Sequence, residues 1–133
     1  CRPPGNRDPR PDEVAACWPW LEAKLDALQP KVVITLGNFA SKRLLETDVG
    51  ITKLRGKAYP FRGGWLVPTF HPAAALRGGR FGGMDPVDAI RADLKVAATE
   101  LTAAAAREEI RLEEPDGSSR RSAKEEHVQE GLF

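Results

Sequence analysis

The sequence predicts an α/β fold, in which helices flank a short parallel sheet. A β-branched run at residues 32–36 is followed at once by a glycine turn and a helical pattern, which makes one strand–helix unit. A second apolar run, residues 65–70, has the length of another buried strand. A long periodic helix pattern follows this run. Alternating strands and helices of this kind are typical of open, mainly parallel sheets.

The N-terminal residues predict an irregular segment and then a helix. Residues 1–11 hold four prolines and a glycine, so we expect an extended course there. Residues 12–29 predict a helix, with Pro19 kinking or breaking it and Pro30 ending it. Its apolar side chains recur on one stripe: Val14, Cys17, Trp18, Leu21, Leu25 and Leu28.

The middle of the chain predicts the strand–helix unit in more detail. Residues 32–36 read as a strand buried on both faces. Asn38 is expected to cap a helix over residues 39–46. Residues 47–64 predict a loop with a short edge strand near Tyr59. Pro68 weakens the strand expected over residues 65–70, because proline cannot donate to a ladder.

The C-terminal third predicts a glycine-rich loop, a helix and a tail. Residues 77–83 read as a mobile loop, and Asp85 and Pro86 have the chemistry of an N-cap and first helical residue. The helix is expected to run to about residue 108. Its predicted buried stripe is Val87, Ile90, Leu94, Ala97 and Leu101. We therefore expect a folded unit over residues 1–108 and a disordered acidic tail over 109–133.

Length and composition exclude several classes of protein. The chain has 133 residues, the size of one domain, and no run of 18 apolar residues that would span a membrane. No secretory leader opens it, so a cytoplasmic protein is expected. The first residue is Cys1 and the single methionine is Met84, which suggests a piece of a longer protein. Two cysteines cannot build a disulfide framework.

Charge is distributed unevenly. Residues 1–106 hold 15 basic and 11 acidic residues, whereas residues 107–133 hold 5 and 8. Residues 53–80 contain six basic residues and no acidic one. Such a stretch suits contact with the phosphates of a nucleic acid, because each neutralised phosphate releases counterions. A solvated basic loop is the alternative.

Two candidate sites follow from position and residue type. Ligands of open α/β sheets bind beyond the carboxyl ends of the strands, where the turn at Gly37 and the segment beginning at His71 are expected. A lone histidine is more often structural, but at this position His71 favours donation of a hydrogen bond to a base carbonyl. Cys1 and Cys17 are either ordinary thiols or two of the four ligands that a zinc or iron–sulfur site needs.

Four segments in order resemble the family 4 uracil-DNA glycosylases, which are bacterial and archaeal base-excision enzymes with a [4Fe–4S] cluster. They are CRPPGNRDPRPDEVAACWPWL (1–21), PKVVITLG (30–37), RG (55–56) and PTFHPAAALR (68–77). The resemblance covers about residues 1–100. It implies a three-layer αβα uracil-DNA glycosylase-like fold with a central parallel sheet, whose N-terminal part lies outside this chain.

The resemblance also assigns roles to residues. Cys1 and Cys17 match the third and fourth cluster ligands, and His71 matches a histidine that hydrogen-bonds O2 of uracil. Arg55 matches a loop near the cluster and the DNA. The remaining matches belong to a loop that enters the DNA minor groove, in which Leu76 would probe the gap left by the flipped base: Ala73, Ala74, Leu76 and Arg77.

The implied function is that of a monomeric uracil-DNA glycosylase of base excision repair, which hydrolyses the N-glycosidic bond of uracil in DNA. This sequence has no counterpart of four family features: the water-positioning motif, the uracil-stacking aromatic, the uracil-reading asparagine and the Cys-x-x-Cys pair. This chain alone is therefore expected to be inactive.

The alternative is a non-catalytic iron–sulfur module that binds DNA. Family 5 enzymes share the cluster and a His-Pro motif. A covalently binding branch is disfavoured because no histidine precedes Cys17, and a nucleotide-binding domain lacks its glycine motif.

The last five residues form a separate candidate site. Gln129, Leu132 and Phe133 resemble the Gln-x-x-Leu-Phe peptides that dock on the bacterial β sliding clamp. A fortuitous apolar end is the alternative.

Overall fold

The structure is a computed structural model that describes residues 3–113, with side chains described to residue 109. A short 3₁₀ turn, η1 (Pro4–Asn6), precedes eight elements. They are α1 (Pro11–Leu28), β1 (Val32–Leu36), α2 (Asn38–Leu45), α3 (Ile51–Leu54), β2 (Tyr59–Phe61), β3 (Gly64–Thr69), α4 (Pro72–Leu76) and α5 (Pro86–Glu113). The α/β class is confirmed. None of the described helices has the length and apolar character to cross a membrane.

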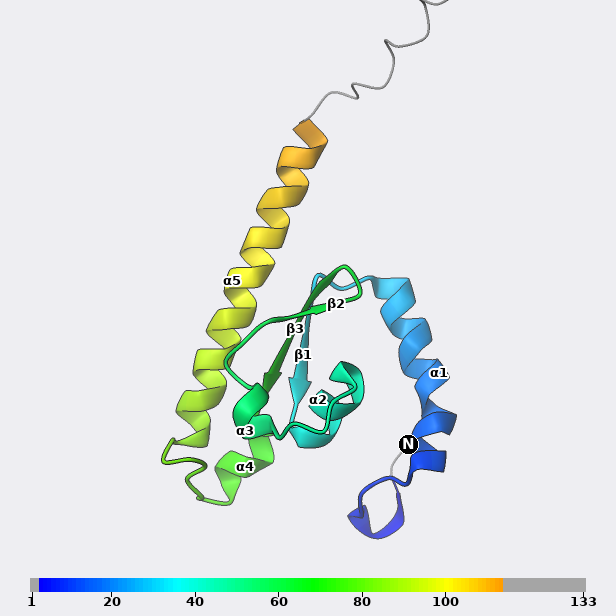
Figure 1. The fold of residues 1–133 in the computed structure, drawn as a ribbon, viewed down its shortest axis with the longest axis vertical. Helices are drawn as coiled ribbons and strands as arrows, with labels where there is room; N and C mark the ends of the chain where they lie inside the picture. The colour runs from blue at the N-terminus through cyan, green and yellow to red at the C-terminus, as the bar shows by residue number, and fades with distance from the viewer. Residues whose placement is uncertain (1–2, 114–133) are drawn as a thin grey trace, which may run out of the picture.

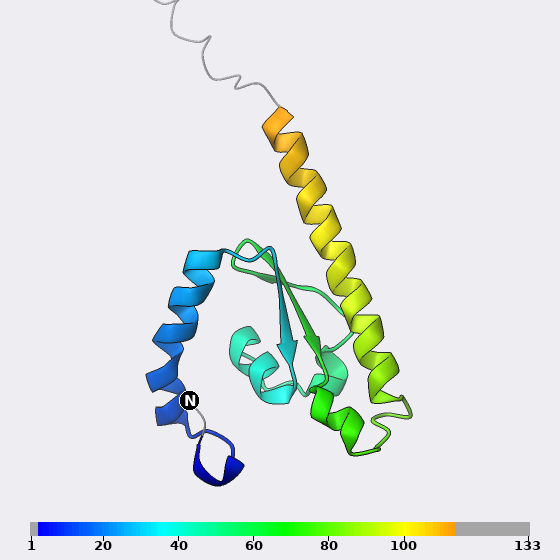
Figure 2. The same ribbon diagram turned by 180° about the vertical axis from the view of Figure 1, so that it is seen from behind.

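The sheet has the strand order β1-β3-β2. β1 and β3 run parallel, so that Leu36 lies opposite Thr69 at their carboxyl ends. β2 is antiparallel to β3 and pairs with it only as far as Leu66. Pro68 therefore lies where β3 has β1 as its single described neighbour, and its missing N–H is tolerated. Figures 1 and 2 show α5 on one side of the sheet, with α1 and α2 on the other.

The core lies where β3 meets α5. Its buried apolar side chains are Leu54, Leu66, Val67, Phe70, Ala89 and Ala97. The expectation that β1 is buried on both faces is wrong, because Ile34 and Leu36 remain 39% and 45% exposed. These side chains lie on the α5 face of the sheet, because Leu36 is in register with Thr69, which bonds to Asp93 of α5, and α5 leaves them partly open. Thr35, on the opposite face, is buried.

Helix α1 follows the prediction at its ends but not at its centre. It is assigned as one helix through Pro19, so the predicted break is absent. It ends before Gln29, which adopts a left-handed conformation. Of the predicted apolar stripe only Leu25 is buried, while Leu21 and Leu28 are exposed.

Asn38 does not cap the helix that it was expected to cap. It is the first residue of α2, and its Oδ1 accepts a hydrogen bond from the backbone N–H of Ile51 at 3.0 Å. This contact fixes the start of α3, a helix that the sequence did not predict. The short edge strand near Tyr59 is confirmed as β2.

Helix α5 begins as predicted, since Asp85 Oδ1 accepts from the N–H of Val87 at 2.8 Å. It continues past the predicted end at 108 to Glu113, so the tail expected over 109–133 starts inside a helix. The predicted buried stripe is rotated, because Val87, Leu94 and Leu101 are about half exposed. The buried positions are Pro86, Ala89, Asp93 and Ala97.

Candidate active site

The carboxyl ends of the parallel strands bring Gly37 and His71 together. The N–H of Gly37 donates to the carbonyl of Thr69 at 2.8 Å, which closes the end of the β1–β3 pair. Gly37 has a φ of +90°, and a Cβ built on it would lie 3.1 Å from Cβ of His71. A side chain at this position would be both strained and crowded. The glycine therefore makes room for the histidine. Both residues lie at the carboxyl ends of the strands, where the sequence predicts them.

His71 is held by the first turn of α4. Its backbone is extended and caps the helix, and its Nδ1 accepts from the N–H of Ala73 at 3.1 Å. In a neutral imidazole, the nitrogen that accepts carries no proton, so the proton resides on Nε2. The side chain is exposed. Local structure thus selects the tautomer that presents an N–H donor to solvent or to a ligand.

A buried charged network lies behind this end of β3. The guanidinium of Arg55 donates from Nε to Asp93 Oδ2 at 3.0 Å and from a terminal nitrogen to Oδ1 at 2.8 Å. The same nitrogen donates to the carbonyl of Ala89. The hydroxyl of Thr69 donates to Asp93 Oδ2 at 2.7 Å. Asp93 is 1% exposed, and the side chain of Arg55 is 13% exposed.

The side chain of Arg55, which the resemblance places near the cluster and the DNA, is engaged within the protein. Its guanidinium turns inward to Asp93, and it lies 5.4 Å from the ring centroid of Phe70. A buried arginine with a carboxylate partner is held by a bidentate ion pair that a phosphate would have to displace. The neighbouring Gly56 remains exposed, with a φ of +80°.

A second buried network fixes the other strand end. The hydroxyls of Thr35 and Ser41 are 2.9 Å apart, and Ser41 donates to the carbonyl of Gly37 at 2.7 Å. Both side chains are buried. Gly37 is thus held on both sides, because its N–H donates to Thr69 and its carbonyl accepts from Ser41.

Four of the five predicted DNA-contacting residues, all except Arg55, lie in α4 or directly after it, beside His71. Ala73 and Ala74 lie half-buried in α4, whereas Leu76, at its end, is 89% exposed. Arg77 follows it and is exposed. Figure 1 shows α4 beyond the end of β3, near the start of α5. Single exposed apolar side chains are ordinary on protein surfaces, and Trp20 and Leu28 are each 76% exposed as well.

The glycine-rich segment after α4 has contacts of its own. The rings of Phe70 and Phe81 are 5.4 Å apart, and Phe81 pairs with Met84 through two backbone hydrogen bonds. Nothing in the structure tests the mobility predicted for residues 77–83.

The basic stretch divides into two groups. Arg55 pairs with Asp93, and Arg62 pairs with Glu22 and Asp26 of α1. The other four are exposed and have no ion-pair partner among the described residues: Lys53, Lys57, Arg77 and Arg80. The positive charge available to an anion is therefore smaller than the sequence count suggested.

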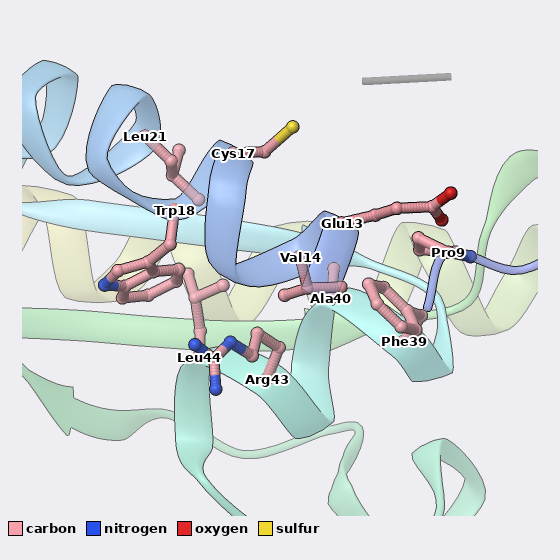
Figure 3. A pocket seen from close by; sticks show the side chains of 10 residues that line it. All are labelled: Pro9, Glu13, Val14, Cys17, Trp18, Leu21, Phe39, Ala40, Arg43 and Leu44. Atoms are coloured by element: carbon pink, nitrogen blue, oxygen red, sulfur yellow. The ribbon is translucent and has the colours of Figure 1, made fainter. Parts of the chain in front are cut away.

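Cys17 lies on α1 at a separate pocket of ≈ 230 Å³ between α1 and α2. Arg43 covers the ring of Trp18 at 4.7 Å on one side of this pocket. Figure 3 shows the sulfur of Cys17 pointing away from the apolar side chains that fill the space between the helices. Cys1 lies outside the described residues, as do Gln129, Leu132 and Phe133. Within the described part of the chain, no three His, Cys, Asp or Glu side chains gather as a metal site would require.

Sequence reasoning missed Asp93 and Thr69. A carboxylate in an amphipathic helix is usually solvated, and this general pattern conceals a buried one such as Asp93. The available signal was its spacing, since it falls four residues from both Ala89 and Ala97 on a face of small residues. A charged side chain on such a face implies a buried partner.

Comparisons with known proteins relate this chain to one family. Residues 1–95 match the family model described as the uracil DNA glycosylase superfamily. The Type-4 uracil-DNA glycosylase of Sulfurisphaera tokodaii is 44% identical over 84 residues, which cover 57% of this chain and 38% of that protein. The Type-4 enzyme of Thermotoga maritima is 43% identical over 79 residues, or 58% and 41%. A Type-5 enzyme of Pyrobaculum aerophilum is 33% identical over 75 residues, or 55% and 33%. The chain spans about two-fifths of the length of the Type-4 relatives it matches.

Proposed function

Because this chain belongs to the uracil DNA glycosylase superfamily, we propose that it is the C-terminal portion of a type-4 uracil-DNA glycosylase. Such an enzyme of base excision repair would hydrolyse the N-glycosidic bond and release uracil from DNA. The observation that carries the proposal is the placement of His71, an exposed imidazole at the strand ends with its proton on Nε2. The higher identity to Type-4 than to Type-5 relatives favours the first class.

The proposed chemistry uses this nitrogen as a donor. Uracil must leave the base stack, at a cost of a few kcal/mol. Cleavage of the C1′–N1 bond leaves its electron pair on uracil. Water adds its hydroxyl to C1′ and releases its other proton to solvent, from which the uracil anion is protonated. His71 Nε2–H would donate to O2 of uracil, where negative charge develops. The Ala73 N–H keeps Nδ1 as the acceptor, so the donor needs no reorganisation during the reaction.

DNA contact is proposed for α4 and the residue that follows it. Leu76 would enter the gap left by the flipped base, and Arg77 would contact a phosphate. Ala73 and Ala74 are small, which allows the backbone of α4 to approach the sugar-phosphate chain closely. The exposure of Leu76 supports this assignment.

Cys17, together with Cys1, is proposed to supply two of the four ligands of a [4Fe–4S] cluster. When bound, the cluster would serve as a structural cross-link between α1 and the chain before it. Support comes from the sulfur of Cys17, which points away from the neighbouring apolar side chains. Replacing Cys17→Ala in the complete natural protein should lower bound iron and the visible absorption of iron–sulfur clusters. Unchanged iron content would reject this ligand.

The function is tested with His71→Ala in the complete natural protein. Loss of one preorganised donor should slow uracil excision by about 10²–10³-fold. The Kd for uracil-containing DNA should change little. His127→Ala, at the other histidine of the chain, is the control and should leave both values unchanged. Unaltered turnover in His71→Ala would contradict the proposed role, and DNA binding without excision by the natural protein would indicate a non-catalytic module.

A sliding-clamp contact is proposed for Gln129, Leu132 and Phe133 on sequence grounds alone. Burying the two apolar side chains in a groove would contribute roughly 3–6 kcal/mol. Ordering the peptide opposes this gain, so a micromolar affinity is expected. Deleting residues 129–133 should abolish clamp binding and leave excision intact. Equal clamp retention by the truncated protein would reject the contact.

We further propose that the protein acts as a cytoplasmic monomer.

A further inference from the structure

We propose that Asp93 and Thr69 are positioning residues for His71. Asp93 holds the carboxyl end of β3 through the hydroxyl of Thr69, and this fixes where the imidazole can point. The inference rests on the proposed role of His71 in uracil excision.

Asp93 connects three segments that are distant in sequence. It lies on α5 and accepts two hydrogen bonds from Arg55, which follows α3, and one from Thr69, the last residue of β3. Both of its oxygens have partners. No side-chain nitrogen or oxygen buried in the described residues lacks a hydrogen bond. A buried network in which every member is satisfied is rigid, because moving one group leaves another unpaired.

Thr69 is restrained from two sides. Its hydroxyl donates to Asp93 at 2.7 Å, and its carbonyl accepts from Gly37 at 2.8 Å. Phe70, the next residue, lies against the guanidinium of Arg55 and the ring of Phe81. Thus both residues that precede His71 are fixed before the chain turns into α4.

Charge also favours this arrangement. An unpaired carboxylate behind the site would oppose the negative charge that develops on departing uracil. Arg55 neutralises Asp93 with a bidentate pair in which Asp93 is almost fully buried. The network therefore supplies rigidity without presenting a net negative charge to the substrate.

The alternative is that the network only stabilises the fold. A structural role would lower stability without any specific effect on His71. A positioning role would lower the excision rate at unchanged DNA affinity, because a misplacement of about 1 Å can cost about 10²-fold in rate.

The test compares Thr69→Val, which removes the hydroxyl at nearly constant shape, with Thr69→Ser, which retains it. Both are made in the complete natural protein and assayed by single-turnover excision from an oligonucleotide with one uracil. Thr69→Val should be about 10-fold slower with an unchanged Kd for DNA, and Thr69→Ser should be close to the natural protein. Ala97→Gly, one turn beyond Asp93 on the buried face of α5, is the stability control and should retain the natural rate.

A double variant shows whether Thr69 acts through His71. In a His71→Ala background, Thr69→Val should cause no further loss, because the group that it positions is gone. An equal loss in both backgrounds would overturn the inference, as would full activity of Thr69→Val or the same loss in Ala97→Gly.

Proton–carbon NMR of the free protein reports on the surroundings of the His71 ring through its chemical shifts, and this measurement does not depend on enzymatic activity. Thr69→Val should shift the ring signals and Thr69→Ser should not. If the natural protein excises no uracil, the proposed function fails, while this spectrum still decides the coupling: unshifted ring signals in Thr69→Val would overturn it.

Discussion

Replacing Gly37→Ala is expected to damage both the stability of the protein and the geometry of the site. Gly37 has φ +90° and ψ 175°, a region that is essentially restricted to glycine. Forcing alanine into it costs about 1–3 kcal/mol of the unfolding free energy. The new Cβ would also lie 3.1 Å from Cβ of His71, closer than an ordinary carbon contact of about 3.5 Å. The histidine must therefore move by a few tenths of an ångström or the backbone must change.

The assay is denaturant unfolding combined with single-turnover uracil excision. Gly37→Ala should lower the unfolding free energy by the stated amount. It should also slow excision by up to about tenfold, since displacement well below 1 Å has a smaller effect than the about 10²-fold loss expected at 1 Å.

Gly50→Ala is the matched control. Gly50 has φ −72° and precedes α3, and a Cβ built on it meets nothing within 4 Å. Gly50 is the N-cap of α3, where alanine is less favourable than glycine, while alanine also restricts the unfolded chain. These effects oppose each other, so the unfolding free energy should change by less than about 1 kcal/mol. Equal stability and equal excision rates for the two alanine variants would refute the reasoning about Gly37.

Three further predictions concern the packing, the pH response and the DNA contact. Asp93→Ala should cost about 3–5 kcal/mol of unfolding free energy, because it leaves the guanidinium of Arg55 buried and unpaired. The double variant Arg55→Met with Asp93→Leu should cost less in the same denaturant titration, and a larger cost would contradict the desolvation argument. Hydrogen bonds from Arg7 lower the pKa of the Glu13 carboxyl to about 2, so its stabilising effect is present above the ordinary value of 4.5 and lost as pH falls toward 2. Glu13→Gln should therefore lower the melting temperature at pH 7 but not near pH 2, and an equal effect at both would exclude the ion pair as its cause. Leu76→Ala should weaken binding to uracil-containing duplex DNA more than to single-stranded DNA, measured by fluorescence anisotropy; equal losses would argue against insertion into the duplex.

Local sequence signals predicted the elements that local chemistry determines. The β-branched run became β1, and the Asp85–Pro86 pair starts α5 as expected. The position of His71 follows from one rule, that ligands of open α/β sheets bind beyond the carboxyl ends of the parallel strands. The first two predictions succeed because the interactions behind them connect residues close together in the chain. The placement of His71 succeeds because parallel strands end at the same edge, although β1 and β3 are distant in sequence.

The remaining features depend on distant partners. Arg55 and Asp93 are 38 residues apart, so no local pattern shows that the arginine turns inward. Asn38 has a good capping side chain, yet the N–H of Ile51 takes its oxygen. The register of α5 against β3 placed Asp93 inside and Leu94 outside, because the buried hydroxyl of Thr69 and the guanidinium of Arg55 require a carboxylate there.

The position of β1 at the edge of the described sheet has a consequence for handling the protein. Within the described part of the chain, β1 pairs only with β3, so its other edge presents backbone donors and acceptors beside the exposed Ile34 and Leu36. Such an edge is a template for strand addition by another chain. Prepared by itself, this polypeptide is therefore prone to concentration-dependent self-association. The substitution Ile34→Lys would place a charge at this edge and reduce aggregation of the polypeptide during crystallisation or NMR.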